Sequence, residues 1–268
     1  MGSSILHISD IHPQPGDDLR DLGQGISDAL KSFKIDFLVA SGDLGYRGQN
    51  QRTAAHWLRE LGQKIKVPIE RIICVPGNHD LDKDHLDNFD EAFQEYSRAL
   101  LDLFENSGRA AVNPASKYLY SDHEFLLINS AYHLDIAHGM VDCEFIRKLL
   151  RNETPRQKHR IAIVHHNPIS VTKLDRSTIV NAYEFLRIIS DAGYEVLLHG
   201  HQHIAMSLRV GQQTRLAGVG SVNFEPGKNI NNQFNVVEVG KRIVRFRFHA
   251  DSMSTSRMGN WDSTEEQW

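Results

Sequence analysis

The segment GYEVLLHGHQH, from Gly193 to His203, leads an apolar run into three histidines. An uninterrupted apolar run is typical of a strand that is buried on both faces. Because alternate residues of an extended backbone face the same side, we expect His201 and His203 to point in one direction. Two imidazoles that converge in this way form either a buried hydrogen-bonded pair or a set of metal ligands. The rest of the chain has to decide between these two interpretations.

Several other short apolar runs predict buried strands, each bounded by turn residues. The predicted strands are residues 5–9, 36–41, 71–75, 125–129, 160–164 and 195–198, the last of which is the run that precedes His199. Helical patterns separate the first three, and further ones cover about 84–105 and follow Asp142 and Thr178. This alternation predicts an α/β fold with a parallel core. After Thr214, strands joined by Gly and Asn turns follow without a helix, which predicts antiparallel strands that finish a sheet.

Composition is that of an ordinary globular protein. The chain has 268 residues, of which 40% are hydrophobic, so one large domain with a filled core is expected. The net charge of −4 does not indicate the positively charged surface that is typical of a nucleic-acid-binding protein. Two cysteines, Cys74 and Cys143, do not support a disulfide framework, which fits a reducing compartment. With no signal-peptide pattern and no apolar stretch of membrane-spanning length, we expect a cytoplasmic protein without a membrane partner.

The chain is expected to divide near residue 250. Residues 1–250 contain all the predicted strands and helices and are predicted to form one domain. Residues 251–268 are polar, lack a period and carry two of the three tryptophans. We expect them to form a C-terminal tail packed on the surface, or a linker to a further domain.

Five of the predicted strands end in side chains that are suited to hold a cation. In α/β sheets, ligands bind beyond the carboxyl ends of the strands, and polar side chains there need partners that metal ions can supply. Taken one at a time, Asp-x-His and Gly-Asp pairs are common in turns. Five such motifs, each at a strand end, favour a metal site instead. Their residues are Asp10, His12, Asp43, Asn78, His79, His165, His166, His201 and His203.

In chain order these motifs are DIH, GD, GNHD, HH and GHQH. The chain resembles the calcineurin-like metallophosphoesterase superfamily, in particular its bacterial phosphodiesterase-like branch, whose signature is D-x-H, G-D, G-N-H-[DE], H and G-H-x-H. The resemblance extends from about Ile5 to Ala250. It implies the metallo-dependent phosphatase fold, an α/β four-layer αββα sandwich of two mixed β-sheets flanked by helices.

The resemblance also implies two bound metal ions and their ligands. The first ion would be held by the residues that match Asp10, His12 and His203. The second would be held by those that match Asn78, His165 and His201. Asp43 matches the carboxylate that bridges the two ions, which lie ~3.5–4 Å apart in two-metal hydrolases. Oxygen and imidazole ligands without a thiolate suit Mn, Fe or Zn better than Cu(I).

Three further residues are expected near the substrate. The family places the histidine matching His79 against the substrate, where it is the expected catalytic acid; orienting a metal ligand is its competing role. His166 follows His165, and adjacent strand residues point opposite ways, so His166 should face the substrate or support a ligand. Arg47 could bind a substrate phosphate with its planar fork, although a solvated surface arginine is the competing interpretation. Gly45-Tyr46 replaces the Val-Asp of the family's phosphoprotein phosphatases, which disfavours that activity.

Together these features predict a dinuclear-metal-dependent phosphodiesterase that cleaves a cyclic nucleotide or another small diester by a metal-bridging hydroxide. A diester carries fewer charges than a monoester, and the ligand motifs contain no lysine or arginine. A DNA or RNA nuclease of the same superfamily is the enzymatic alternative, although the net acidity does not favour a nucleic-acid partner. The alternative of another class is a catalytically weak, metal-bound interaction module. That alternative predicts missing ligands, whereas this chain retains all of them.

Overall fold

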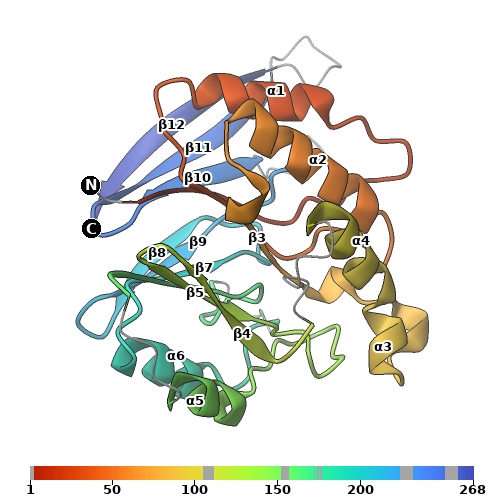
Figure 1. Ribbon diagram of the computed structural model, residues 1–268, viewed down its shortest axis with the longest axis vertical. Helices are drawn as coiled ribbons and strands as arrows, with labels where there is room; N and C mark the ends of the chain where they lie inside the picture. Colours follow the sequence, from red (N-terminus) through yellow and green to blue (C-terminus); the bar gives the residue numbers. More distant parts are fainter. Residues whose placement is uncertain are drawn as a thin grey trace.

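The computed structural model describes residues 3–104, 112–151, 157–171, 173, 175, 177–223, 232–250 and 259–268 (Figure 1). Two six-stranded sheets pack face to face, and helices cover their outer faces. This confirms the predicted four-layer sandwich of two mixed sheets.

The first sheet has the strand order β12-β11-β10-β1-β2-β3. Its strands are β1 (Ser4–Ile8), β2 (Phe37–Ser41), β3 (Ile72–Val75), β10 (Gln233–Glu238), β11 (Arg242–Ala250) and β12 (Gly259–Gln267). β1, β2 and β3 are parallel, whereas β10 is antiparallel to β1 and begins an antiparallel run that continues to β12. The strands predicted at the start of the chain therefore form the parallel half, and β10 and β11 are the antiparallel strands expected after Thr214.

The second sheet has the order β4-β5-β6-β7-β9-β8. Its strands are β4 (Ala115–Tyr120), β5 (His123–Ile128), β6 (His159–Ile163), β7 (Val196–His199), β8 (Met206–Val210) and β9 (Thr214–Gly218). The two edge strands, β4 and β8, were not predicted, because each buries only one side chain. β9 was expected to be antiparallel, but β8 turns the chain back first, so that β9 lies parallel to β7.

Helices α1 (Arg20–Ala29), α2 (Gln51–Lys64) and α4 (Gln94–Phe104) lie on the side of the first sheet, and α5 (Cys143–Arg151) and α6 (Ala182–Asp191) cover the second (Figure 1). The single helix predicted over about 84–105 is wrong, because the segment is broken. The side chain of Asn88 accepts a hydrogen bond from Asp90 N and starts the short helix α3 (Phe89–Ala92), which ends before α4 begins. Among the described residues, no helix combines the length and apolarity needed to cross a membrane.

Strand periodicity divides the apolar residues into three layers. Ile5 of β1 and Val39 of β2 face the second sheet and pack in the layer between the sheets. Their neighbours Leu6 and Leu38 face the opposite way and pack against the helices of the first sheet. A third layer lies between the second sheet and α5 and α6. The two sheets are therefore held in a fixed relation by a dry layer, which fixes the positions of the loops at their edges.

The C-terminal segment differs from the expected tail. Gly259–Gln267 forms β12, which pairs with β11 over nine residue pairs at the edge of the first sheet. The ring of Trp261 lies 4.6 Å from that of Phe234 and 5.4 Å from that of Phe248, measured between centroids. Backbone pairing needs no apolar period, so a polar segment with one aromatic anchor joins the edge without a sequence signal. The predicted boundary at residue 250 lies beside residues 251–258, outside the described residues, and stays a prediction.

Candidate metal centre

The candidate site forms where the loops after β1, β2, β6 and β7 meet at one edge of the two sheets. Asp10 N donates to Gly42 O at 3.1 Å, and Gly200 N donates to His165 O at 3.0 Å, so the loops are tied in pairs. Gly42 has a φ of +96°, and a Cβ there would collide with the ring of His165. The glycines of the GD and GH motifs therefore permit loops to pass close to one another.

The backbone of the site is held in an unusual conformation. Residues with positive φ include Asp10, His12, Asp43, His201 and His203, with values from 42° to 74°. Non-glycine residues in this left-handed region cost on the order of 1–3 kcal/mol each and concentrate at functional sites. The extended backbone expected at His201 and His203 is therefore wrong, because β7 ends at His199 and both residues lie in the turn that follows.

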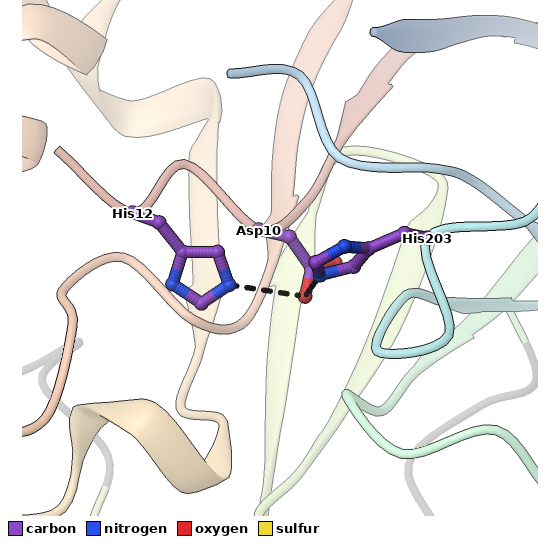
Figure 2. Close-up of side chains that lie close together, drawn as sticks. All are labelled: Asp10, His12 and His203. Carbon is purple, nitrogen blue, oxygen red and sulfur yellow. Dashed lines mark hydrogen bonds and ion pairs between the residues drawn. The ribbon is translucent and has the colours of Figure 1, made fainter. Parts of the chain in front are cut away.

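The first cluster consists of Asp10, His12 and His203. Their ligand-type atoms all lie within 4.8 Å of one another. Figure 2 shows both rings turned toward the carboxylate, with His203 Nε2 at 3.2 Å and His12 Nε2 at 3.7 Å from Asp10 Oδ1. His12 Nδ1 lies 2.9 Å from Gly45 O, which leaves Nε2 facing the cluster. Two segments distant in the sequence, the loop after β1 and the turn after β7, thus bring two nitrogens and one oxygen to one point.

The second cluster consists of Asp43, His165 and His201, with the same limit of 4.8 Å. His165 Nε2 lies 3.2 Å from Asp43 Oδ2 and 3.2 Å from His201 Nδ1. His165 Nδ1 lies 2.8 Å from Ser41 O, so a backbone carbonyl orients this ring. The HH and GHQH motifs therefore meet at the carboxylate that follows β2.

Asp43 also joins the two clusters. Its Oδ2 lies 3.5 Å from His12 Nε2 in the first cluster and 3.2 Å from His165 Nε2 in the second. Its Oδ1 accepts a hydrogen bond from His79 N at 2.8 Å, which fixes the plane of the carboxylate. Asp43 thus lies between the two clusters, where one carboxylate serves both.

Charge and burial in the site favour cations. The side chains of Asp10 and Asp43 are 0% and 1% exposed, and histidines are their only ion-pair partners among the described residues. Burial lowers the pKa of His165, but the charge of Asp43 and the hydrogen bond to it, together with the charge of Asp10 and the hydrogen bond to Ser41 O, outweigh burial and raise this pKa to about 9. Two buried carboxylates that attract protons this strongly need positive partners. Two divalent cations would supply them, so the two clusters are consistent with a dinuclear metal site.

Asn78 belongs to the GNHD segment, which contacts the Asp43 carboxylate through His79 N. It follows Gly77, where a Cβ would collide with the Asp43 carboxylate, and it precedes His79. Its side chain is buried, and Nδ2 donates to Ile136 O at 3.2 Å. Its Oδ1 is buried without a hydrogen-bond partner among the described residues. A buried amide oxygen without a partner is of a type that can serve as a metal ligand.

His79 and Arg47 lie on the Tyr46 side of the site. The His79 ring stacks on Tyr46 at 5.1 Å with an interplanar angle of 10°, and it lies 5.0 Å from the His12 ring. Burial lowers the pKa of His79 to about 4. Arg47 is exposed, with its guanidinium carbon 5.1 Å from the centroid of the Tyr46 ring. The structure therefore places His79 at the first cluster, whereas Arg47 lies on Tyr46, farther from the cluster than His79.

His166 is fully buried rather than open to the site's surface. Its Nδ1 lies 2.8 Å from Ser130 Oγ, and its ring centroid lies 4.5 Å from that of His201. Its Nε2 has no partner among the described residues. Burial, followed by the charges of His201 and His165, lowers the pKa of His166 well below its ordinary value. His166 is thus a neutral ring packed against the second cluster.

Three supporting residues escaped the sequence analysis. Asp80 is buried and accepts hydrogen bonds from the backbone of Leu44, Gly45 and Gly77, which ties the loop after β2 to the GNHD motif. Burial, followed by the charge of Asp43, raises the pKa of Asp80 to about 7. Tyr46, which stacks on His79, and Ser221, whose hydroxyl donates to Asp10 O at 2.7 Å, are the others. Only Asp80 had a signal in the sequence, namely its place inside the GNHD motif.

Comparison with known proteins agrees with this geometry. A sequence model of the calcineurin-like phosphoesterase family matches residues 3–205. A dimetal phosphatase from Danio rerio has a TM-score of 0.59 at 12% identity, over 97% of this chain and 98% of that chain. GAP50, the anchor in the inner membrane complex of Plasmodium, has a TM-score of 0.55 at 13% identity, over 94% of this chain and 86% of that chain. At these identities, structural likeness shows the fold alone. A comparison with curated proteins gives no significant match.

Proposed function

Because the chain belongs to the calcineurin-like phosphoesterase family, we propose that it is a two-metal phosphodiesterase acting on cyclic nucleotides or other small phosphodiesters. The observation that carries this proposal is the position of Asp43, whose Oδ2 lies within 3.5 Å of one histidine from each cluster. Asp10, His12 and His203 would hold one cation. Asn78, His165 and His201 would hold the other, with Asp43 shared. These oxygen and imidazole ligands suit Mn, Fe or Zn.

When bound, two such cations lower the pKa of water to near neutral and neutralise charge on a phosphoryl group. The chain's own residues prepare the site for them. Asp43 is fixed through its Oδ1 by the His79 amide, so its Oδ2 keeps its place between the clusters. Ser41 O orients His165 in the same way, and we propose that His166 supports the ring of His201 rather than contacting the substrate.

His79 is the proposed catalytic residue. Because burial lowers its pKa to about 4, the ring is neutral near pH 7 in the free protein and keeps one N–H. We propose that this N–H donates a hydrogen bond to the leaving oxygen and stabilises its negative charge as the P–O bond breaks, and that the released oxygen then takes its proton from solvent water. Stacking on Tyr46 holds the ring plane, which gives the donor a constant direction.

Among the described residues, the cationic side chains on the His79 side of the site are Lys83, whose charge acts on His79, and Arg47, and this small number supports a diester substrate. A phosphate monoester carries nearly two charges at neutral pH, whereas a diester carries one. Arg47 is the guanidinium that approaches His79 through Tyr46, and it is exposed to solvent. An enzyme for monoesters gains from buried cationic groups around the phosphate, and Arg47 is exposed. Arg47 is therefore proposed as a peripheral contact to the substrate.

Hydrolysis of two chromogenic esters tests the proposal. In Mn²⁺, bis(p-nitrophenyl) phosphate should be hydrolysed with a higher kcat/KM than p-nitrophenyl phosphate, and a chelator should abolish both activities. Cyclic nucleotides and single- and double-stranded DNA complete the panel. A monoester preference across Mn²⁺, Zn²⁺ and pH would make the protein a phosphatase, and efficient cleavage of DNA alone would make it a nuclease.

A pair of variants tests the place of Arg47. Arg47→Gln should raise KM for the diester about tenfold or less and leave kcat nearly unchanged, since Arg47 lies outside the clusters. Arg209→Gln, at an exposed arginine on β8, is the matched control and should change neither constant. A fall in kcat of a hundredfold in Arg47→Gln would show that this arginine contacts the reacting phosphate.

A further inference from the structure

A cleft of about 770 Å³ opens between the two sheets at the edge opposite the candidate metal centre. Strands β1, β2 and β6 begin beside it, at Ser4, Phe37 and His159, and their other ends lead into the loops of the metal centre. Sites for small molecules occupy about 300–1,000 Å³. The cleft is therefore large enough for an organic ligand. It is separated from the metal centre by the full length of these strands.

Four lysine and arginine side chains line the cleft, and two of them already have an acidic partner. Lys241 and Arg242 pair with the carboxylate of Glu238 at 2.7 and 2.8 Å. Within the described part of the chain, no carboxylate lies at ion-pair distance from Lys34 or Arg71. Asp36 and Asp122 also line the cleft, where Asp36 accepts a hydrogen bond from Ser4 N and Asp122 lies 2.9 Å from His123 Nδ1. The charges of Lys34 and Arg71 are thus the ones available to an anion.

Aromatic rings hold one of these two charges in place. The guanidinium carbon of Arg71 lies 5.0 Å from the centroid of the Tyr120 ring and 5.9 Å from that of Phe37. The Phe37 and Tyr120 rings meet edge to face at 5.7 Å. Phe33 and Tyr120 are partly exposed in the cleft, so each offers part of a ring face to a ligand. The cleft therefore combines a pre-positioned guanidinium with aromatic surface.

Polar atoms without partners concentrate on the same walls. Buried atoms that lack a hydrogen-bond partner in the described part of the chain include Ser3 Oγ, Arg71 Nε, His123 Nε2 and His159 Nε2, all of which belong to residues lining the cleft. Most buried polar groups in proteins are hydrogen-bonded, so the walls of this cleft are unusually polar for their burial.

We propose that this cleft binds a nucleoside monophosphate, with its phosphate against Lys34 and Arg71 and its base against Tyr120 or Phe33. The charges match, because a phosphate monoester carries about −1.5 to −2 at neutral pH and the cleft offers two unpaired cations. The partly exposed rings match the base. An inorganic anion would leave the rings unused, and a neutral aromatic molecule would leave both cations unpaired. This site does not depend on which ester the metal centre cleaves.

Isothermal titration calorimetry with the metal-loaded protein tests the proposal, using AMP as the probe. Adenosine, which lacks the charge, and inorganic phosphate, which lacks the ring, should each bind at least about tenfold more weakly than AMP. Arg71→Met should weaken AMP binding by about 10- to 100-fold, as expected for a charge-assisted hydrogen bond. Lys34→Gln removes an exposed charge that takes no part in packing, so it covers the case in which Arg71→Met fails to fold. Arg209→Met, on β8, is the control and should bind AMP as the unaltered protein does.

The metal centre could also bind AMP, and Asp43→Asn separates the two sites. In the Asp43→Asn variant, AMP binding in the cleft should persist. In the double variant Asp43→Asn/Arg71→Met, AMP binding should be lost. AMP binding that disappears with Asp43→Asn and is unchanged by both Arg71→Met and Lys34→Gln would overturn the proposal, as would no AMP binding at all. Equal affinities for AMP and inorganic phosphate would overturn the ligand class.

Discussion

Replacing Asp43 with asparagine removes one negative charge from both clusters while the shape of the side chain is kept. The Asp43 carboxylate is 1% exposed and lies within 3.5 Å of His12 and 3.2 Å of His165, so both candidate metal positions lose an anionic neighbour. Asparagine still accepts the hydrogen bond from His79 N through Oδ1, so the loop should keep its conformation. The change therefore isolates charge from geometry.

The expected effect follows from Coulomb's law. Two opposite unit charges about 4 Å apart attract by about 4 kcal/mol at the effective dielectric constant of a partly buried pair. Since 1.36 kcal/mol is a factor of ten, removing this charge should weaken binding of each cation about 10³-fold or more. At micromolar free metal, Asp43→Asn should therefore lose at least one ion per chain and nearly all diester hydrolysis.

Elemental analysis after gel filtration measures the metal content, and hydrolysis of bis(p-nitrophenyl) phosphate measures turnover. Asp21→Asn, at an exposed aspartate of α1, is the control and should retain both ions. A melting temperature close to that of the unaltered protein shows that Asp43→Asn folds. Two ions per chain with turnover within tenfold of the unaltered protein would refute the shared role of Asp43.

Three further changes test other parts of the structure. His79→Ala should keep both metals while hydrolysis falls ~10²–10⁴-fold, as expected when a group that stabilises the leaving oxygen is removed; loss of metal with the ring would show that His79 is a ligand. Glu124 is buried against Arg160 at 2.7 Å and Tyr194 at 2.6 Å, so Glu124→Gln should lower the free energy of unfolding by about 3–5 kcal/mol at neutral pH. Burial raises the pKa of Glu124, but the hydrogen bonds from Tyr194 and Arg160 outweigh burial, so the pKa is lowered from its ordinary value of 4.5. The stabilisation by the Glu124 carboxylate is therefore present above pH 4.5 and is lost as the pH falls through the pKa of Glu124 in the folded protein. Urea unfolding at pH 7 and in acid should therefore show a difference between Glu124→Gln and the unaltered protein that shrinks in acid; a constant difference would contradict it. A chain that ends at Asp251 lacks β12 and Trp261 and should lose about 3 kcal/mol or more of stability, yet it should bind both metals, because β12 lies three strands from β1; a folded truncation without metal would contradict that separation.

Several features of this protein could be predicted from its sequence because they are local. Buried strands such as Ile72–Val75 are short apolar runs between turn residues, and periodicity reports them directly. The residues of both clusters were predicted because each follows such a strand at a fixed spacing, as in Gly42-Asp43 and the GNHD motif. Parallel strands then bring their carboxyl ends to one edge, so the order of the motifs along the chain predicts that they meet.

Other features depend on which segments pack together, and the sequence holds no local signal for them. β12 is polar and aperiodic, and it exists because β11 presents an unpaired backbone edge that any extended segment can join. The stacking of Tyr46 on His79 and the burial of His166 against Ser130 join residues at least 33 positions apart, through loops whose paths the two sheets impose. The cleft between Arg71 and Tyr120 arises only because the sheets meet at a particular angle and separation. Side-chain chemistry and strand periodicity can be recognised from neighbouring residues in the sequence. Contacts between distant loops depend instead on how the two sheets pack against the apolar layer between them.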